Sequence, residues 1–275
     1  MLNRIANMNL HYHRYPLDYF LDSTVRLGLD AVELWGGAPH LFLPDLGHAD
    51  LRQVLGGLRQ RGLELVCLTP EQCIYPVNLS AKDEACRRRS LDYFRRAIGA
   101  ANTLECSRLL VTAGYGFFNE PREEAWERGR ASLAELADEA REAGVTLLLE
   151  PLSRFGSNLV TDLASLQRMH REVDSPALKI LLDTVPMMLA GDTLEAYGEA
   201  FGEELVHLHF LDGDGKTSAH LAWGEGVYPL DAFRESLQRI GYRGALSLEL
   251  IGPQYNRDPE KASRDSLIYL GFSHP

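Results

Sequence analysis

The segment LLLEPL, residues 147–152, is a run of leucines that ends in a glutamate and a proline. Three later segments are built in the same way, with a polar or ionisable side chain near the end of an apolar run: KILLDT at 179–184, VHLHFL at 206–211 and ALSLEL at 245–250. Short apolar runs that alternate with helical patterns are typical of parallel strands in repeated βα units. The second half of the chain therefore predicts consecutive strands of one parallel sheet.

The same alternation extends over the whole chain, in which eight short apolar or β-branched runs alternate with eight amphipathic stretches. The predicted strands lie near 3–9, 30–35, 63–69, 107–113, 145–150, 178–183, 205–211 and 244–250. The predicted helices lie near 17–28, 49–62, 82–104, 121–143, 161–173, 192–201, 230–240 and 258–270. Eight such pairs in 275 residues are typical of an α/β protein with the (β/α)8 TIM-barrel fold. Because no Pro/Ser-rich linker or block of charge divides the chain, we expect a single domain over residues 1–275.

Several strands are entered through a glycine at the end of the preceding helix, namely Gly28, Gly62, Gly144 and Gly241. Helices commonly end at a residue in the left-handed conformation, which glycine adopts without a clash of Cβ. These glycines therefore support the predicted helix boundaries.

Side-chain direction on these strands can be predicted, because every second residue of a barrel strand points into the lumen. The residues expected to pack outward against the helices are Leu147, Leu149, Ile180, Leu182, Val206, Leu208, Leu246 and Leu248. The polar residues expected to point inward are Glu150, Asp183, His207, His209 and Glu249. Barrel enzymes build their active sites at the C-terminal ends of the strands, which is where these polar residues lie.

Four of them, Glu150, Asp183, His209 and Glu249, offer three carboxylates and one imidazole to a single place. Carboxylates that meet in a water-poor lumen repel one another, and a divalent cation is the simplest group that relieves the repulsion. Oxygen ligands with one imidazole suit Mn²⁺, Mg²⁺ or Co²⁺ better than a metal that prefers sulfur. We therefore predict that these side chains bind one divalent metal ion.

The alternative is a purely structural role for these groups. Any one carboxylate at a strand end could be a hydrogen-bonded core residue or a salt-bridge partner, whereas four in phase on adjacent strands favour a common centre. His207 lies deeper on the same face as His209, so we expect a core histidine or one that supports the ligands.

Four further residues are candidates for contact with a substrate. Glu33, in AVELWGG, has inward parity at the end of the second strand, where it could contact a substrate hydroxyl or form a salt bridge at the barrel rim. The loops add His40 in GAPHLFLPD, Glu71 in TPEQCIYPVN and Glu225 in the glycine-rich turn GEG at 224–226. A Gly-x-Gly sequence by itself indicates no more than a turn.

Composition restricts the class of partner. A net charge of −11 disfavours binding to nucleic acid, which depends on Lys and Arg at the phosphates. No apolar run approaches the roughly 20 residues that a membrane span needs, and the polar N-terminal segment does not resemble a signal peptide, so we expect a cytoplasmic protein. The four cysteines, Cys67, Cys73, Cys86 and Cys106, form no CxxC pair and are expected to be reduced.

At the four predicted ligands the chain resembles the xylose isomerase-like superfamily of sugar phosphate isomerases and epimerases, over essentially its whole length. Within that superfamily, VELWGGAPHLFLPDL, TPEQCIYPVN, LLLEPLS, HLHFLDGDG and WGEGVYPL look like the bacterial fructoselysine 3-epimerases. The resemblance implies a Mn²⁺ ion at the four ligands, with Mg²⁺, Co²⁺, Ni²⁺ or Zn²⁺ as alternatives. It also implies that Glu150 and Glu249 are the catalytic acid/base groups, and that a dimer or tetramer of identical chains can form.

The chain departs at three places from the related enzymes that act on free ketohexoses. Those enzymes carry a substrate-binding His, an Arg and a Glu where this chain has Pro186, Gly215 and Gly156. The first two departures fit the fructoselysine subgroup, whereas a glutamate is expected at position 156 even there. None of the three departures replaces a predicted metal ligand.

The expected reaction is epimerisation at C3 of a ketose or ketosamine, such as fructoselysine or psicoselysine. A proton must leave one face of C3 and another must arrive at the opposite face, which two carboxylates flanking the substrate can achieve. The resulting enediolate needs stabilisation, for which a metal ion is suited.

The same ligands would also serve a hydroxypyruvate isomerase-like sugar isomerase or an inosose dehydratase. An endonuclease IV-like enzyme is disfavoured by the acidic charge and the small number of inward histidines. A barrel that binds a sugar derivative without turnover is the non-enzymatic alternative.

Overall fold

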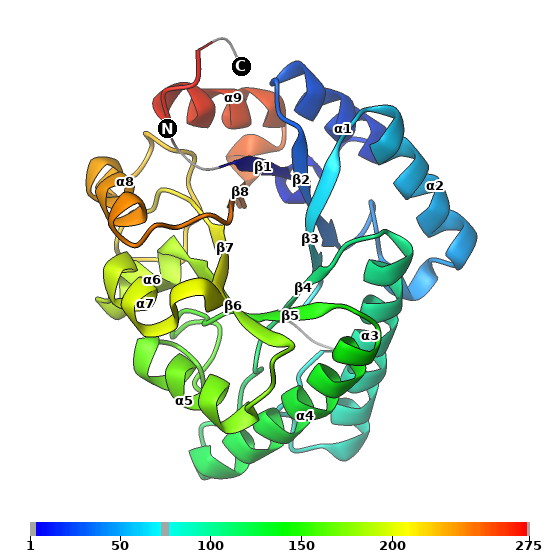
Figure 1. Ribbon diagram of the computed structural model, residues 1–275, viewed down its shortest axis with the longest axis vertical. Helices are drawn as coiled ribbons and strands as arrows, with labels where there is room; N and C mark the ends of the chain where they lie inside the picture. Colours follow the sequence, from blue (N-terminus) through cyan, green and yellow to red (C-terminus); the bar gives the residue numbers. More distant parts are fainter. Residues whose placement is uncertain (1–3, 73–76, 274–275) are drawn as a thin grey trace.

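The computed structural model describes residues 4–72 and 77–273, which form a closed barrel of eight parallel strands. Each strand pairs with its neighbours in sequence order, and β1 closes the barrel against β8 (Figure 1). The strands are β1 Ile5–Met8, β2 Ala31–Gly36, β3 Glu64–Pro70, β4 Arg108–Val111, β5 Thr146–Leu149, β6 Leu178–Asp183, β7 Leu205–His209 and β8 Ala245–Leu248. The predicted fold and all eight predicted strands are confirmed.

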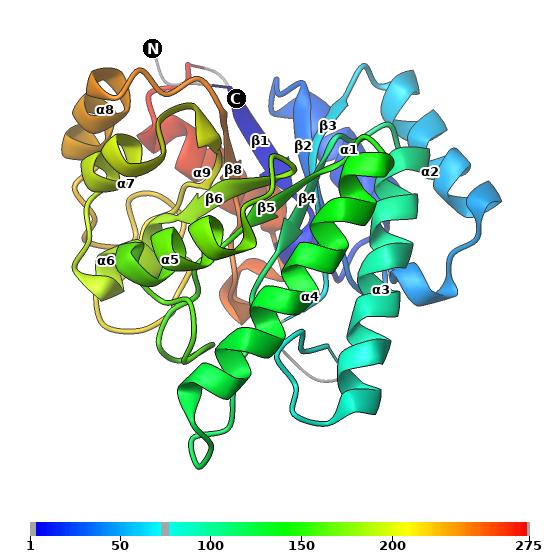
Figure 2. The same cartoon turned by 60° about the horizontal axis from the view of Figure 1, so that its bottom comes forward.

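The helices form a ring around the barrel, and Figure 2 shows the long helices α3 and α4 packed side by side on one flank. The α-helices are α1 Leu17–Arg26, α2 His48–Gln60, α3 Glu84–Thr103, α4 Arg122–Glu142, α5 Leu163–Val173, α6 Thr184–Ala190, α7 Leu194–Phe201, α8 Leu230–Arg239 and α9 Pro259–Tyr269. Short 3-10 helices occupy Leu10–Tyr12, Leu43–Asp45, Gly202–Glu204 and Pro253–Tyr255.

The sequence did not predict α6, which begins directly after β6. Its N-cap is Asp183, whose Oδ1 accepts a hydrogen bond of 2.7 Å from the backbone N–H of Val185. Pro186 lies in the first turn, where a missing N–H costs no intrahelical hydrogen bond. The short helix thus fixes one oxygen of a predicted metal ligand.

The four glycines that were expected to end helices all have positive φ angles, between 63° and 71°. The left-handed backbone lets each helix turn sharply into the next strand, as at Gly144, where Val145 donates back to the carbonyl of Ala140.

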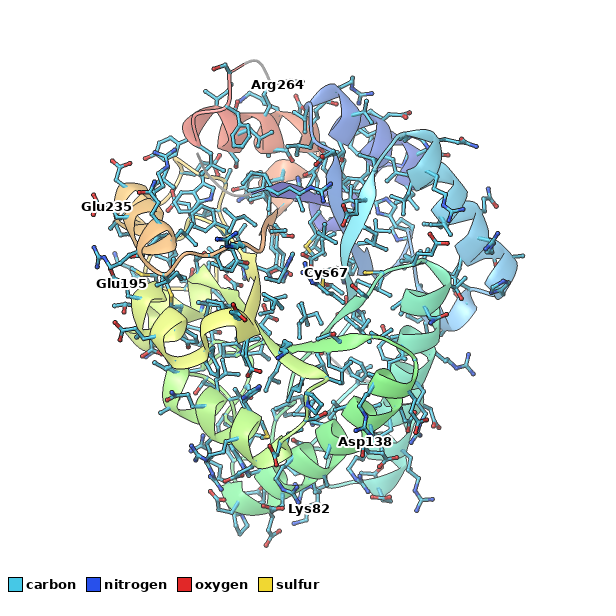
Figure 3. The ribbon with its side chains drawn as sticks, in the orientation of Figure 1. Cys67, Lys82, Asp138, Glu195, Glu235 and Arg264 are labelled. Atoms are coloured by element: carbon cyan, nitrogen blue, oxygen red, sulfur yellow. The ribbon has the colours of Figure 1, made fainter. Side chains whose placement is uncertain are left out.

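The predicted outward residues pack between the strands and helices in one large apolar core, apart from Val206. A bulge causes this exception, because Ile180 pairs with Leu205 whereas Leu181 already pairs with His207. The extra residue turns Val206 toward the lumen, so its predicted outward direction was wrong. A small layer inside the barrel contains Cys67, Leu110, Leu148 and Leu181. Figure 3 shows Cys67 near the barrel centre, whereas Asp138, Glu195 and Glu235 lie on the outer helices.

Within the described residues, none of the helices is both long and apolar enough to cross a membrane. In the part of the chain that the structure describes, Cys67 and Cys106 are buried free thiols, and Cys73 lies outside that part.

Candidate metal centre

The four predicted ligands meet at the C-terminal mouth of the barrel. Glu150 and Glu249 follow the last residues of β5 and β8, while Asp183 and His209 end β6 and β7. One ligand atom from each side chain lies within 4.8 Å of those from the other three. Such spacing is compatible with a single coordinated cation. Strand parity thus brings the four side chains together as expected, and their role as metal ligands stays a prediction.

The ring of His209 is turned so that Nδ1 faces the carboxylates. Nδ1 lies 3.0 Å from Glu150 Oε1 and 3.1 Å from Glu249 Oε2. Although it is buried, this nitrogen makes no hydrogen bond of acceptable geometry with any described residue. A nitrogen lone pair aimed at the space between carboxylates fits a divalent cation, since three carboxylates and one imidazole are ligands for such ions.

A hydrogen-bonded layer lies directly beneath this cluster. His209 Nε2 is 2.9 Å from Glu33 Oε1, and His207 Nε2 is 2.7 Å from Glu33 Oε2. Thr69 donates its hydroxyl to Glu33 Oε1, and Ser247 Oγ lies 2.9 Å from His207 Nε2. Glu33 is therefore held by groups from β3 and β7, while Ser247 from β8 contacts His207.

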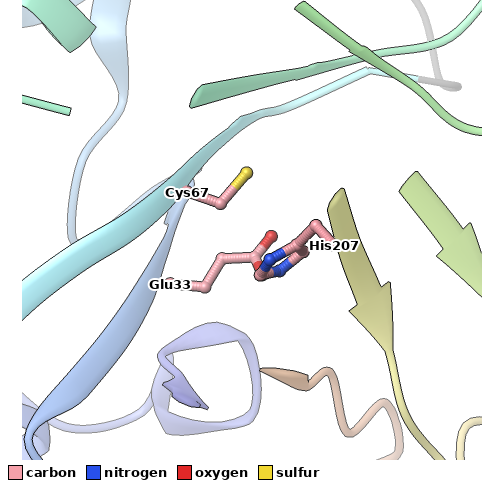
Figure 4. A group of neighbouring side chains, drawn as sticks. All are labelled: Glu33, Cys67 and His207. Carbon is pink, nitrogen blue, oxygen red and sulfur yellow. The ribbon is translucent and has the colours of Figure 1, made fainter. Parts of the chain in front are cut away.

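Glu33, Cys67 and His207 form a second group that could in principle bind a metal, and Figure 4 shows them converging from β2, β3 and β7. All three are fully buried. Burial raises the pKa of the Cys67 thiol well above its usual value, with Glu33 adding to the effect. A neutral thiol is a poor metal ligand, and the Glu33 oxygens already accept hydrogen bonds, so this layer suits a supporting role for His209.

The carboxyl groups of the two layers have pKa values that are shifted in opposite directions. Burial by itself would raise the pKa of Glu33, but His209 and His207 outweigh burial and hold that pKa well below its usual range. Burial tends to lower the pKa of His209, but Glu249 and Glu33 together hold it well above the usual value. Burial raises the pKa of Glu150 to about 7, with partial compensation by His209. The protein alone thus offers too little positive charge for all of its clustered carboxylates.

A cavity of about 430 Å³ opens beside the cluster. Its walls come from Leu10, Trp35, Thr69, Pro70, Glu71, Gln72, Leu110, Glu150, Leu152, Ser153, Gly156, Asp183, Val185, Pro186, Ser218, His220, Glu249 and Ile251. A pocket of this size, with apolar walls and a few convergent polar groups, is typical of a small-molecule site. The predicted metal ligands form one side of that site.

The model of the family described as "Xylose isomerase-like TIM barrel" matches residues 21–271. The chain belongs to this family. It is 31% identical to the fructoselysine 3-epimerase of Shigella flexneri over 93% of this chain and 92% of that protein. It is 26% identical to the D-psicose 3-epimerase of Ruminiclostridium cellulolyticum, over 84% of this chain and 77% of that protein. The crystal structure of 3-keto-D-glucoside 4-epimerase from E. coli superposes with a TM-score of 0.82 at 22% identity, covering 98% of this chain and 99% of that one.

Membership of the xylose isomerase-like family confirms the resemblance predicted from the sequence. The relatives also confirm the predicted enzyme class, because sugar epimerases are isomerases. The match to the solved structure, at its lower identity, supports the fold alone.

Of the four predicted substrate contacts in this xylose isomerase-like barrel, only Glu71 lies in the cavity wall. Its Oε2 accepts a hydrogen bond of 2.7 Å from the indole N–H of Trp35, and burial raises its pKa. Glu33 lies below the cavity with both oxygens bonded, which argues against the expected substrate contact.

His40 and Glu225 also lie outside the cavity wall. Asn9 donates from Nδ2 to His40 Nδ1 at 3.0 Å, and His40 Nε2 donates to the carbonyl of Tyr15 at 2.6 Å. Glu225 accepts the hydroxyl of Tyr255. Both side chains therefore have partners within the protein that explain their positions without a substrate.

His220 was missed from the sequence, although it lies in the cavity wall. Its Nε2 is 2.8 Å from Asp183 Oδ2 and 3.4 Å from Glu249 Oε2, while Nδ1 is 3.0 Å from the carbonyl of Ser218. Burial would lower the pKa of His220, but Asp183 and Glu249 raise it to about 9. The only sequence signal was a histidine in the long segment between β7 and α8, whose position depends on the folded loop.

Asp212 organises the loop that carries His220. Its two carboxylate oxygens accept backbone hydrogen bonds of 2.8–3.1 Å from four residues: Gly213, Gly224, Gly226 and Tyr228. The backbone of residue 220 then bridges to that of Ile251, just beyond β8. A buried carboxylate thereby brings a distant histidine next to Asp183 and Glu249.

Proposed function

We propose that this protein is a divalent-metal-dependent epimerase that acts at C3 of a ketose or ketosamine such as fructoselysine or psicoselysine. The observation that carries the proposal is the convergence of Glu150, Asp183, His209 and Glu249 beside a cavity large enough for a sugar derivative. Similarity to fructoselysine 3-epimerase over 93% of the chain supports the choice of substrate class.

The proposed ligands are one oxygen from each of the three carboxylates and Nδ1 of His209. Mn²⁺ is the ion that we expect first, with Mg²⁺, Co²⁺, Ni²⁺ and Zn²⁺ as alternatives. When bound, such a cation supplies Lewis-acid stabilisation for negative charge that develops on neighbouring substrate oxygens. Glu33 orients the ligand nitrogen by accepting the hydrogen bond from Nε2, an arrangement often found for metal-binding histidines.

Glu150 and Glu249 are the proposed acid/base pair. They extend from β5 and β8, which are separated by β6 and β7, so they can reach the reacting carbon from different sides. One carboxylate removes the proton from C3 and the other returns a proton to the opposite face, giving the inverted configuration. Which of them acts first depends on the epimer that binds.

The lining of the cavity supports a substrate with a substituent beyond the sugar. Gly156 and Pro186 lie in its wall, at positions where a Glu and a His are expected in enzymes for free ketohexoses. Neither residue fills the space that such a longer polar side chain would take. Gly215 lies outside this wall. We infer that an amine-linked group at C1 is accommodated beside Pro186, which is the departure in this wall that fits the fructoselysine subgroup.

Turnover in D₂O tests this proposal. The purified protein, with its metal content measured, is incubated with fructoselysine, psicoselysine, D-fructose and D-psicose. We expect interconversion of the first two with one solvent deuterium incorporated at C3. Loss of water, or isomerisation between C1 and C2, would instead identify a dehydratase or an aldose–ketose isomerase. Binding of these sugars without any turnover would indicate a binding protein. The cytoplasmic location and the homo-oligomer stay predictions.

A further inference from the structure

Gln72 has one half of its amide group occupied and the other half without a partner. Its Oε1 accepts a hydrogen bond of 2.8 Å from the backbone N–H of Thr112, just beyond β4. Its Nε2 is buried and has no hydrogen-bond partner in the parts of the chain that the structure describes, 4–72 and 77–273. The side chain is 8% exposed and belongs to the cavity wall.

An amide NH₂ group that is removed from water without an acceptor is unfavourable, and such groups are rare in folded proteins. The hydrogen bond to Thr112 explains the position of the oxygen only. A hydrogen-bond acceptor that enters the cavity would explain the nitrogen. The bond to Thr112 also fixes which end of the amide faces inward, so Gln72 presents a donor rather than an acceptor.

The position of Gln72 in the barrel indicates which part of a ligand it meets. Gln72 follows β3, whereas His209 ends β7, and these strands lie opposite one another in the closed order of eight. A substrate whose reacting carbons lie between Glu150 and Glu249, which follow β5 and β8, must extend toward the ends of β3 and β4 to reach Gln72. The group that accepts the hydrogen bond is therefore remote from C2 and C3.

We propose that Gln72 is a specificity-determining residue, which donates from Nε2 to an oxygen of the substrate beyond C3. The sugar chain of a ketose carries hydroxyl groups at C4, C5 and C6, any one of which can accept this bond. A site that is built to bond a hydroxyl group discriminates against an analogue that lacks it, because the buried polar group is then left unpaired. This proposal rests on the proposed epimerase function.

The test compares Gln72→Met with the wild type on the parent ketosamine and on its 4-, 5- and 6-deoxy analogues. Methionine is similar in length and has no donor. We expect kcat/KM for the parent to fall about 10- to 100-fold, mainly through KM, with unchanged metal content. For one deoxy analogue, the wild type and the variant should have the same kcat/KM, because the partner oxygen is already missing.

Two further variants separate this role from a structural one. Gln72→Glu keeps an oxygen for the N–H of Thr112 but cannot donate when it is ionised, so it should lose the same discrimination even if Gln72→Met folds poorly. Gln53→Met makes the same chemical change on the exposed surface of α2 and should match the wild type.

Three outcomes would overturn the proposal. If an active wild type and both Gln72 variants show kcat/KM values within twofold for the parent, Gln72 does not bind substrate. An equal loss for the parent and every deoxy analogue would show a general structural effect. A wild type with no turnover of any ketose or ketosamine would remove the epimerase function, and this proposal with it.

Discussion

Glu33 and His209 face one another inside the barrel, with Oε1 of the glutamate 2.9 Å from Nε2 of the histidine. Both side chains are fully buried, and the opposite nitrogen of the same ring, Nδ1, points at Glu150 and Glu249. One hydrogen bond therefore determines which nitrogen of His209 carries the proton and which is offered to a cation.

Replacing Glu33 by Gln should weaken metal binding without removing any ligand. The variant keeps the shape of the side chain but loses the charge that favours proton sharing with His209 Nε2, and its NH₂ group can face His207. We expect the Kd for Mn²⁺, measured by calorimetry, to rise about 10- to 100-fold. Glu124→Gln, on the exposed start of α4, is the control. Equal affinities for the two variants would show that Glu33 does not support the site.

Removing the metal should lower the melting temperature. A cation that binds only the folded state stabilises it by about 2.7 kcal/mol at a free concentration one hundred times its Kd. For a protein of this size, that corresponds to a rise in Tm of roughly 5–10 °C. Dialysis against a chelator followed by addition of Mn²⁺ measures the effect. Asp183→Asn should abolish most of the response, and a full response in that variant would contradict the ligand assignment.

Glu150→Gln and Glu249→Gln should each still exchange the C3 proton of one epimer with solvent. The epimer that exchanges should differ between the two variants. Each variant loses one of the two proposed proton-transfer groups, so epimerisation should slow about 10²- to 10⁴-fold. The remaining carboxylate can still remove and return a proton on its own face. Proton NMR in D₂O should therefore show exchange without inversion for one epimer in one variant, and for the other epimer in the other variant. Exchange of the same epimer in both would contradict the division of roles.

The strand ends of the second half could be predicted because strand alternation is a local property. The position of each apolar run was sufficient to predict the inward direction of Glu150, Asp183, His209 and Glu249. The same argument failed at Val206, where a bulge between β6 and β7 inserts one residue and reverses the direction of one side chain. Bulges depend on the pairing of two strands, which alternation within one strand does not reveal.

Loop residues were harder to predict, since their positions depend on contacts between distant segments. His220 reaches Asp183 only because Asp212 folds the loop. Glu33 was correctly predicted to point inward, but its depth depends on His207 and His209, which approach from β7. From the sequence alone, only the side of the strand on which such a residue lies can be predicted. The opposing strands then determine whether it contacts substrate or other side chains.

Asp212→Asn should destabilise the loop that carries His220. The asparagine side chain would place an NH₂ group against two backbone N–H groups whose hydrogen bonds the carboxylate now accepts. These N–H groups belong to Gly224 and Gly226 if the NH₂ replaces Oδ2, or to Gly213 and Tyr228 if it replaces Oδ1. Buried donors without acceptors cost about 1–3 kcal/mol. Hydrogen exchange should show lost protection at residues 212–228. Asp214→Asn, in the same loop, keeps the single oxygen Oδ1 that accepts the backbone hydrogen bonds of Lys216 and Thr217, so it should have a smaller effect. Equal effects would contradict the role of Asp212.

Part of the acid sensitivity of folding should come from His11. Burial lowers the pKa of His11 to about 3, from an ordinary value near 6.5. Below pH 6.5 the unfolded chain therefore binds a proton that the folded chain does not, so this stability is complete above pH 6.5 and is lost progressively as the pH falls toward 3. At pH 5 the loss amounts to about 2 kcal/mol.

Urea unfolding of wild type and His11→Asn at pH 8 and pH 5 isolates this contribution, because all other titrating groups are shared. The variant should be less stable at pH 8, where it lacks the hydrogen bond of His11 Nε2 with Ser263 Oγ, but its stability should fall less on acidification. His48→Asn, at the exposed start of α2, should keep the full pH dependence of the wild type. An equal loss of stability between pH 8 and pH 5 in wild type and His11→Asn would mean that His11 is protonated in the folded protein as readily as in the unfolded chain.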